Sequence, residues 1–219
     1  MYNRELQYFQ ILVPTTDTVK YKFMLETLVS RGYHTLITGE TGVGKSVTVQ
    51  DFLNSAGDNL VSAFVNFSGK TQSKNLQDVF ESKLEKKRKT LLGPPGGKKM
   101  IFFLDDVNMP QLDRYGSQPP IELLRQTIDN GGIYDTKKLH FKYIADTYFA
   151  VACAPPSGGR NEVTPRLFRH FNMIWFPDLS VKSMELIFTS ILRGFLELNA
   201  QSGLEIFAES IVRASVEMY

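Results

Sequence analysis

Residues 39–46 read GETGVGKS, a glycine-rich segment that ends in a lysine and a serine. The spacing G-x-x-x-x-G-K-[ST] is typical of a phosphate-binding loop when a strand precedes it and a helix follows. Its glycines let backbone N–H groups turn toward a phosphate, and the helix N-terminus adds a favourable dipole. Lys45 can then reach the β- and γ-phosphates, and the Ser46 hydroxyl can bind Mg²⁺. The residues expected to line this site are Gly39, Glu40, Thr41, Gly42, Val43, Gly44, Lys45 and Ser46.

A second chemical feature lies at residues 99–110, KMIFFLDDVNMP, where an apolar run ends in Asp105 and Asp106. In phosphate-loop NTPases an acid at the tip of an apolar strand holds Mg²⁺ opposite the loop hydroxyl, and we assign this role to Asp105. Where the strand ends and turns, Asp106 can swing toward the γ-phosphate and align a water molecule. The alternative, a solvated turn aspartate, stays open for Asp106 because a short side chain must still reach the water.

Composition narrows the class of protein. The chain has 219 residues, 42% of them hydrophobic and 22% charged, so it can bury the core of an α/β domain. Its formal charge of +2 gives no argument for a nucleic-acid or membrane surface. One cysteine and three scattered histidines predict neither an internal disulfide nor a zinc cluster. The start lacks the long apolar core of a signal peptide, and no long uncharged apolar run follows, so we expect a soluble intracellular protein.

Strand and helix patterns alternate along the chain, which predicts a mainly parallel sheet covered on both faces. An extended segment at 9–18 precedes them, and residues 133–144 read as a β-hairpin inserted between core elements. Strands are expected at 34–39, 60–68, 99–107, 147–156 and 173–178. Helices are expected at 19–32, 47–57, 73–93, 119–132, 164–171 and 180–198. The basic run at 85–89 is interpreted as the solvated end of a helix and not as a nucleic-acid patch.

The motifs favour ATP and point to one family. The chain contains neither the N-K-x-D tetrapeptide that reads guanine nor a signature near LSGGQ. The ordered set of VPTTDTVKY at 13–21, GETGVGKS, FLDDVNMP at 103–110, ACAPPSGGRNEVTPRLFRHF at 152–171 and WFPD at 175–178 resembles the third AAA+ module of a dynein heavy chain. The forms DDVNMP and PPSGGRN look closer to axonemal than to cytoplasmic dyneins.

The resemblance implies a P-loop AAA+ fold: a three-layer αβα sandwich with a mainly parallel five-stranded sheet, an inserted β-hairpin and the start of a helical lid. Residues 1–178 would form the large nucleotide-binding subdomain, and residues 179–219 the start of a truncated lid, so we expect a part of a longer protein. The ligands would be ATP or ADP with Mg²⁺. By the same resemblance, Val13, Pro14 and Thr15 would pack on adenine.

Two departures from the AAA+ pattern bear on catalysis. The family usually has Glu where this chain has Asp106, whose side chain is one methylene shorter. Displacing a catalytic carboxylate by about 1 Å can cost on the order of a hundredfold in rate. The end of the fourth core strand commonly carries a polar sensor, often Asn, where this chain has Ala154. The resemblance therefore implies firm nucleotide binding with slow or absent hydrolysis. A hydrolytically active module, in which Asp106 suffices, is the alternative.

Two arginines, Arg166 and Arg169, lie three residues apart in TPRLFRHF. In AAA+ rings an arginine at this place reaches the γ-phosphate of the neighbouring module, and such a finger is worth roughly 10³ to 10⁵ in rate. Either residue could take this role. The competing interpretation is a pair of surface arginines bound to carboxylates.

At the level of the whole protein, the resemblance implies a regulatory site in the ring of a microtubule-based, minus-end-directed ciliary motor. Its partners would be neighbouring AAA+ modules of the same heavy chain, dynein intermediate and light chains, and microtubules, with no nucleic acid and no membrane. The location would be cytoplasmic, on the cytoskeleton of the axoneme of a cilium or flagellum. A non-dynein AAA+ remodeller or helicase, which would bind nucleic acid, is the remaining alternative.

Overall fold

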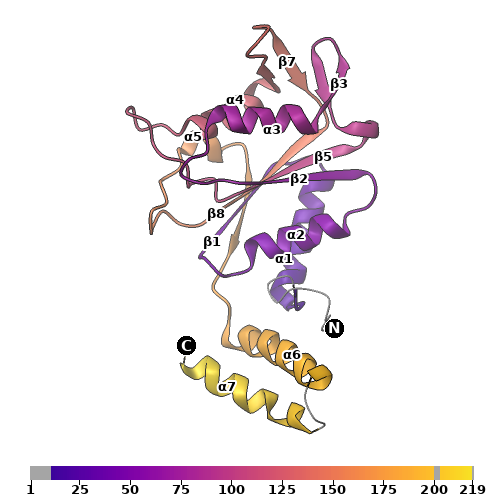
Figure 1. The fold of residues 1–219 in the computed structure, drawn as a ribbon, viewed down its shortest axis with the longest axis vertical. Coiled ribbons are helices and arrows are strands. Elements are labelled where there is room, and N and C mark those ends of the chain that lie inside the picture. Colours follow the sequence, from indigo (N-terminus) through magenta and orange to yellow (C-terminus); the bar gives the residue numbers. More distant parts are fainter. Residues whose placement is uncertain (1–10, 200–202, 219) are drawn as a thin grey trace. The chain divides into compact units, whose positions relative to one another are not determined.

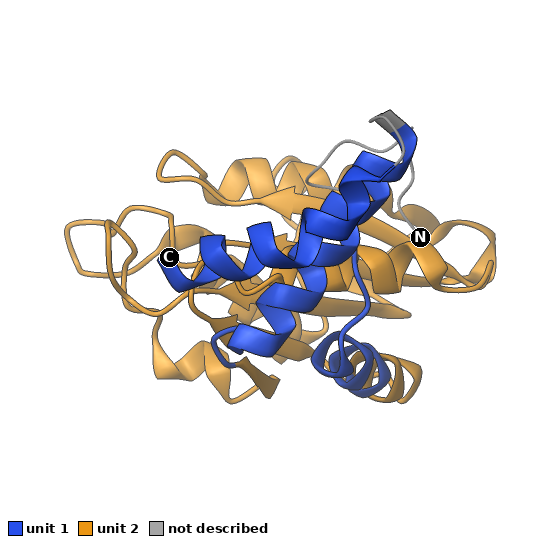
Figure 2. Ribbon diagram, turned by 90° about the horizontal axis from the view of Figure 1, so that it is seen from below, with its two compact units in different colours: residues 1–24, 177–219 blue, residues 25–176 orange. Residues whose placement is uncertain are grey.

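The computed structural model describes residues 11–199 and 203–218. The chain divides into two compact units, residues 25–176 and residues 1–24 with 177–219 (Figure 2). Helix α1 (Thr16–Ser30) crosses the boundary between them. The assignment of 1–178 and 179–219 to a large subdomain and a lid stays a prediction.

The larger unit is built on a five-stranded sheet with the strand order β2-β5-β8-β1-β9 (Figure 1). All four strand pairings in it are parallel. The strands are β1 (Thr35–Gly39), β2 (Leu60–Asn66), β5 (Lys99–Asp105), β8 (Thr147–Cys153) and β9 (Asn172–Phe176). The predicted mainly parallel sheet is confirmed.

Helices cover both faces of this sheet. Figure 1 shows α3 and α4 on one side and α2 on the other. On the first side, the rings of Phe80, Phe102 and Phe149 pack together, with centroid distances of 4.8 to 5.9 Å. Burial on both faces explains why β5 is apolar over five successive residues. The helices of this unit after α1 are α2 (Lys45–Ser55), α3 (Ser73–Lys83), α4 (Pro119–Asn130) and the short α5 (Pro165–Phe168).

A second, four-stranded sheet has the order β3-β4-β7-β6. Strands β6 (Gly132–Tyr134) and β7 (Phe141–Ile144) pair antiparallel, as predicted for the inserted hairpin. The helix predicted over 73–93 is wrong beyond Lys83, because β3 (Glu85–Arg88) and β4 (Leu91–Gly93) follow it. They form an antiparallel pair, and β4 also pairs with β7. A short 3₁₀ helix, η2 (Pro95–Gly97), then precedes β5.

The basic run at 85–89 is therefore an exposed edge strand with its turn and not a helix end. Its residues are all exposed, so no apolar face holds them in a helix. Lysine-rich edges also discourage pairing with other chains. The next strand, β4, finds its partner about fifty residues later in the sequence.

The smaller unit contains α6 (Val181–Asn199), η3 (Leu204–Phe207) and α7 (Ala208–Met218). The Ser180 hydroxyl accepts the Ser183 N–H at 3.1 Å and caps α6, as predicted. Arg193 on α6 binds Glu209 on α7 at 2.7 Å. Among the described residues, none of the helices combines the length and apolar character needed to cross a membrane.

The first helix begins earlier than predicted. Thr18 N–H donates to the Thr15 hydroxyl at 3.2 Å, and Thr15 N–H donates to the Thr18 hydroxyl at 2.8 Å. This reciprocal cap starts α1 at Thr16 and not at 19. Part of the extended segment predicted at 9–18 lies outside the described residues, and residues 11–15 have no regular secondary structure.

His34 fixes the start of β1 against β8. Its Nδ1 accepts the Phe149 N–H at 3.1 Å, and its ring lies 5.5 Å from that of Phe149 and 6.0 Å from that of Phe171. Burial and, to a smaller extent, the charge of His170 lower the pKa of His34 from 6.5 to about 4. The folded chain therefore holds this imidazole neutral.

Because the pKa of His34 is depressed on folding, its contribution to stability is complete above pH 6.5 and is lost as the pH falls toward 4. His34→Asn keeps an acceptor for Phe149 but cannot be protonated. We expect urea unfolding at pH 7 and pH 4.5 to show a smaller stability difference in this variant than in the wild type. An equally large difference in both proteins would contradict the assignment.

Candidate nucleotide-binding site

The phosphate loop joins β1 to α2 in a conformation that requires glycine. Gly42 and Gly44 have φ of 93° and 84°, values that side chains rarely allow. Gly39 is restricted by space as well, since a Cβ there would lie 2.3 Å from the carbonyl oxygen of Phe176. Helix α2 begins directly after Gly44, so its first N–H groups face the loop.

Lys45 is anchored inside the curve of the loop. Its Nζ donates to the carbonyl oxygens of Gly39 at 2.7 Å and Glu40 at 2.6 Å. Burial lowers the pKa of Lys45, while the negative charge of Asp105 opposes this shift. The loop thus holds the Lys45 ammonium group through two carbonyl oxygens. Phosphate oxygens can replace these carbonyls as hydrogen-bond acceptors.

Ser46 and Asp105 meet across the sheet. The Ser46 hydroxyl donates to Asp105 Oδ2, and Asp105 Oδ1 accepts the N–H of Asp106 at 3.0 Å. Burial raises the pKa of Asp105, and the Ser46 hydrogen bond works against this rise. A hydroxyl beside a carboxylate offers the hard oxygen ligands that Mg²⁺ takes, because Mg²⁺ usually binds one or two carboxylates plus phosphate oxygens and waters. The donor set therefore fits the predicted metal.

Asp106 occupies the turn that follows β5. Its φ is 53°, and its side chain is 48% exposed. Asp106 lines the same cavity as Lys45 and Ala154. Ala154 contributes no polar side chain there, and its carbonyl oxygen accepts the buried Asn108 amide at 2.6 Å.

The structure adds one charged residue that sequence reasoning missed. Arg160, in the PPSGGRN loop after β8, lines the same cavity, and its Nε lies 3.9 Å from Asp106 Oδ1. The signal was available, because carboxyl ends of neighbouring parallel strands meet at one edge of a sheet and bind ligands there. In the sequence, Arg160 is a lone arginine next to two glycines, whereas Arg166 and Arg169 after it match a family position.

The structure brings most of the residues predicted from the two motifs to one cavity. The cavity is lined by Thr41, Gly42, Gly44, Lys45, Ser46, Val47, Asp105, Asp106, Ala154 and Arg160. Gly39 and Glu40 take part through their carbonyls, whereas Val43 is not among the lining residues. Val13, Pro14 and Thr15 belong to the other compact unit, so their contact with adenine stays a prediction.

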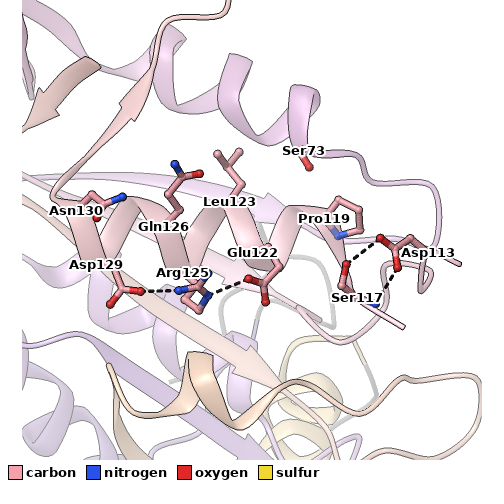
Figure 3. Close-up of a pocket in the computed structure, with 10 residues that line it drawn as sticks. All are labelled: Ser73, Asp113, Ser117, Pro119, Glu122, Leu123, Arg125, Gln126, Asp129 and Asn130. Atoms are coloured by element: carbon pink, nitrogen blue, oxygen red, sulfur yellow. Dashed lines mark hydrogen bonds and ion pairs between the residues drawn. The ribbon is translucent and has the colours of Figure 1, made fainter. Parts of the chain in front are cut away.

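The two candidate finger arginines lie outside this cavity. Arg169 follows α5 and binds Asp129 of α4 at 2.8 Å, and His170 lies 3.0 Å from the same oxygen. Figure 3 shows Arg125 held between Asp129 and Glu122, at 2.7 and 2.9 Å, along one wall of a separate pocket on α4. Partial burial raises the pKa of Asp129, but the hydrogen bonds and charges of its arginine and histidine neighbours lower it overall.

Arg166 differs from Arg169 in having no such partner. It is exposed on α5, and among residues 11–199 and 203–218 no hydrogen bond or ion pair involves its guanidinium group. The interpretation as a carboxylate-paired surface arginine therefore applies to Arg169. Arg166 remains available for contact with another molecule.

The fold and the site define a phosphate-loop nucleotide-binding domain of the AAA+ type. The family described as the P-loop containing dynein motor region matches residues 1–179, and the chain belongs to this family. It is 52% identical over 220 residues, 100% of the chain, to dynein axonemal heavy chain 6 of Homo sapiens. It is 46% identical to dynein axonemal heavy chain 1 of Homo sapiens over 195 residues, 88% of the chain.

A more distant similarity, 40% over 213 residues and 97% of the chain, is to the dynein-1-beta heavy chain of the flagellar inner arm I1 complex of Chlamydomonas reinhardtii. The chain spans about 5% of the length of each of these three relatives. The domain is thus a small portion of the proteins it resembles.

The clash at Gly39 predicts a large stability effect. Gly39→Ala should destabilise the chain by more than about 2 kcal/mol, because the new methyl group meets the Phe176 carbonyl in a strained backbone conformation. The control Gly57→Ala, whose Cβ would meet nothing within 4 Å, should change stability by less than about 1 kcal/mol. Urea unfolding measures both, and equal effects would contradict the close approach of β1 and β9.

Proposed function

We propose that this chain is the third AAA+ module of an axonemal dynein heavy chain, and that it binds ATP or ADP with Mg²⁺ as a regulatory site of the motor ring. The observation that carries the proposal is the convergence of Lys45, Ser46 and Asp105 on one cavity. The similarity to axonemal heavy chains supports the dynein assignment. The order of the motifs supports the third module.

Each residue has a defined part in binding. The loop N–H groups at the start of α2 bind phosphate oxygens, and Lys45 exchanges the carbonyls of Gly39 and Glu40 for them. Ser46 and Asp105, which are hydrogen-bonded to each other, would be the protein ligands of the metal ion. A bound Mg²⁺ would supply positive charge that offsets the negative charge of the phosphates.

Slow hydrolysis follows from two positions. Asp106 is one methylene shorter than the usual glutamate, so its carboxylate stands farther from the attacking water. Ala154 cannot hold the γ-phosphate or the water with its side chain, and Asn108 already binds its carbonyl. The site therefore retains nucleotide and turns it over slowly.

A second candidate function is an active ATPase module. The observation in its favour is that Asp106 lines the cavity with a half-exposed carboxylate, which can contact water. A remodeller or helicase is disfavoured by membership in the dynein motor-region family. Salt-sensitive nucleic-acid binding by the purified chain would revive that candidate.

At the level of the motor, the proposed partners are neighbouring AAA+ modules, intermediate and light chains, and microtubules, with no role for nucleic acid or membrane. The proposed location is the cytoplasmic cytoskeleton of the axoneme in a cilium or flagellum, where the motor moves toward microtubule minus ends.

Within the ring, Arg166 is the proposed arginine finger toward a neighbouring module, because Asp129 already binds Arg169. In the full-length heavy chain, Arg166→Ala should slow hydrolysis more than Arg169→Ala.

Binding is tested by calorimetric titration of the 219-residue chain with ATP and with ADP in the presence of Mg²⁺. Lys45→Ala removes charge-assisted hydrogen bonds to phosphate and should weaken both ligands about 10- to 100-fold. The control Lys98→Ala, an exposed lysine outside the cavity, should leave both affinities unchanged. Equal affinities for the wild type and Lys45→Ala would contradict the site.

Hydrolysis is tested under single-turnover conditions by following ADP formation from ATP bound to the same chain. Lengthening the acid in Asp106→Glu should raise the rate by about 10- to 100-fold, since it restores roughly 1 Å of reach. A fast burst in the wild type that disappears in Asp106→Asn would instead establish the active-ATPase alternative.

A further inference from the structure

Hydrogen bonds fix the backbone of Arg160 but not its guanidinium group. The Arg160 backbone N–H donates to the Ser157 carbonyl at 3.1 Å, in a turn where Gly158 and Gly159 have φ of 57° and 85°. The next residue, Asn161, donates its backbone N–H to the Asn108 carbonyl at 2.9 Å and its side-chain amide to the Pro110 carbonyl at 2.8 Å. These bonds tie the loop after β8 to the loop that begins with Asp106.

In the part of the chain that the structure describes, the Nε of the guanidinium group, in contrast, has no hydrogen-bond acceptor. The Arg160 side chain is 21% exposed, and its Nε is buried without a hydrogen-bond partner among the described residues. Asp106 Oδ1, at 3.9 Å, is too far for a hydrogen bond. Because a buried unpaired donor is costly, the position of this N–H beside a phosphate loop indicates a ligand rich in oxygen acceptors.

The cavity also gathers positive charge. Arg160 and Lys45 both line it, and the charge of Arg160 contributes to lowering the pKa of Lys45. Such mutual repulsion is relieved when a polyanion lies between the two cations. Arg160 reaches the cavity from the loop after β8, and Lys45 reaches it from the loop after β1.

We propose that Arg160 binds the terminal phosphate of a nucleoside triphosphate in this same site and supplies the polar contact that Ala154 lacks. This inference rests on the proposed nucleotide-binding function and adds a residue that distinguishes ATP from ADP. A planar guanidinium group suits this role, because it can donate two parallel hydrogen bonds to phosphate oxygens.

The test compares the affinities of the 219-residue chain for MgATPγS and MgADP in the wild type, Arg160→Met and Arg160→Lys. Arg160→Met should weaken ATPγS binding about 10- to 100-fold and ADP binding less than about threefold, because only the triphosphate loses a charge-assisted contact. Arg160→Lys keeps the positive charge, so its affinity for ATPγS should lie between those of the wild type and Arg160→Met. The control Arg88→Met, at an exposed arginine of β3, should change neither affinity.

The ratio of the two affinities separates recognition from folding, because a merely structural role would weaken both ligands alike. Equal losses for ATPγS and ADP, or no loss for either, would overturn the assignment of Arg160 and leave the proposed nucleotide site intact. A wild-type chain that binds neither ligand would overturn both. If Arg160→Met lowers the thermal midpoint, an unchanged affinity ratio in Arg160→Lys would also count against the assignment.

Discussion

The hydrogen bond from the Ser46 hydroxyl to Asp105 is the contact on which the rest of the site depends. It joins two segments that lie 59 residues apart in the sequence. Strands β1 and β5 are not neighbours, because β8 lies between them and pairs with both. The parallel registers of Thr38 with Cys153 and of Leu104 with Val151 bring the strand ends to one edge of the sheet. The sheet therefore sets the distance between hydroxyl and carboxylate.

Two adjacent carboxylates at this edge of the sheet repel each other, and neighbouring groups offset this repulsion. Burial raises the pKa of Asp105, and the neighbouring charge of Asp106 raises it further. The Ser46 hydroxyl, the Asp106 N–H and the Lys45 ammonium group act in the opposite direction. The adjacent charges are tolerated because Asp106 leaves the strand in a left-handed conformation, which aspartate adopts more readily than most residues. The apolar strand β5 thus ends in two carboxylates that line the cavity beside the phosphate loop.

The features predictable from sequence were those encoded locally. The loop GETGVGKS, the apolar run before Asp105 and the turn residues of the hairpin each specify their conformation within a few positions. The edge pair β3 and β4 could not be predicted in the same way, because residues 85–90 are polar throughout and β4 obtains its partner from β7. The position of Arg160 follows from the sequence only in part: its loop comes after a predicted parallel strand, but the folded sheet is what places the side chain beside Asp106.

Ser46 and Asp105 together are expected to bind Mg²⁺ beside a phosphate on the loop of Lys45. The most direct measurement is the affinity of the chain for ATP with Mg²⁺ and with the metal removed by a chelator, in the wild type and in Asp105→Asn. We expect Mg²⁺ to tighten ATP binding in the wild type, and this gain to be largely lost in Asp105→Asn, where one charged ligand is missing. The same gain from Mg²⁺ in both proteins would contradict this expectation.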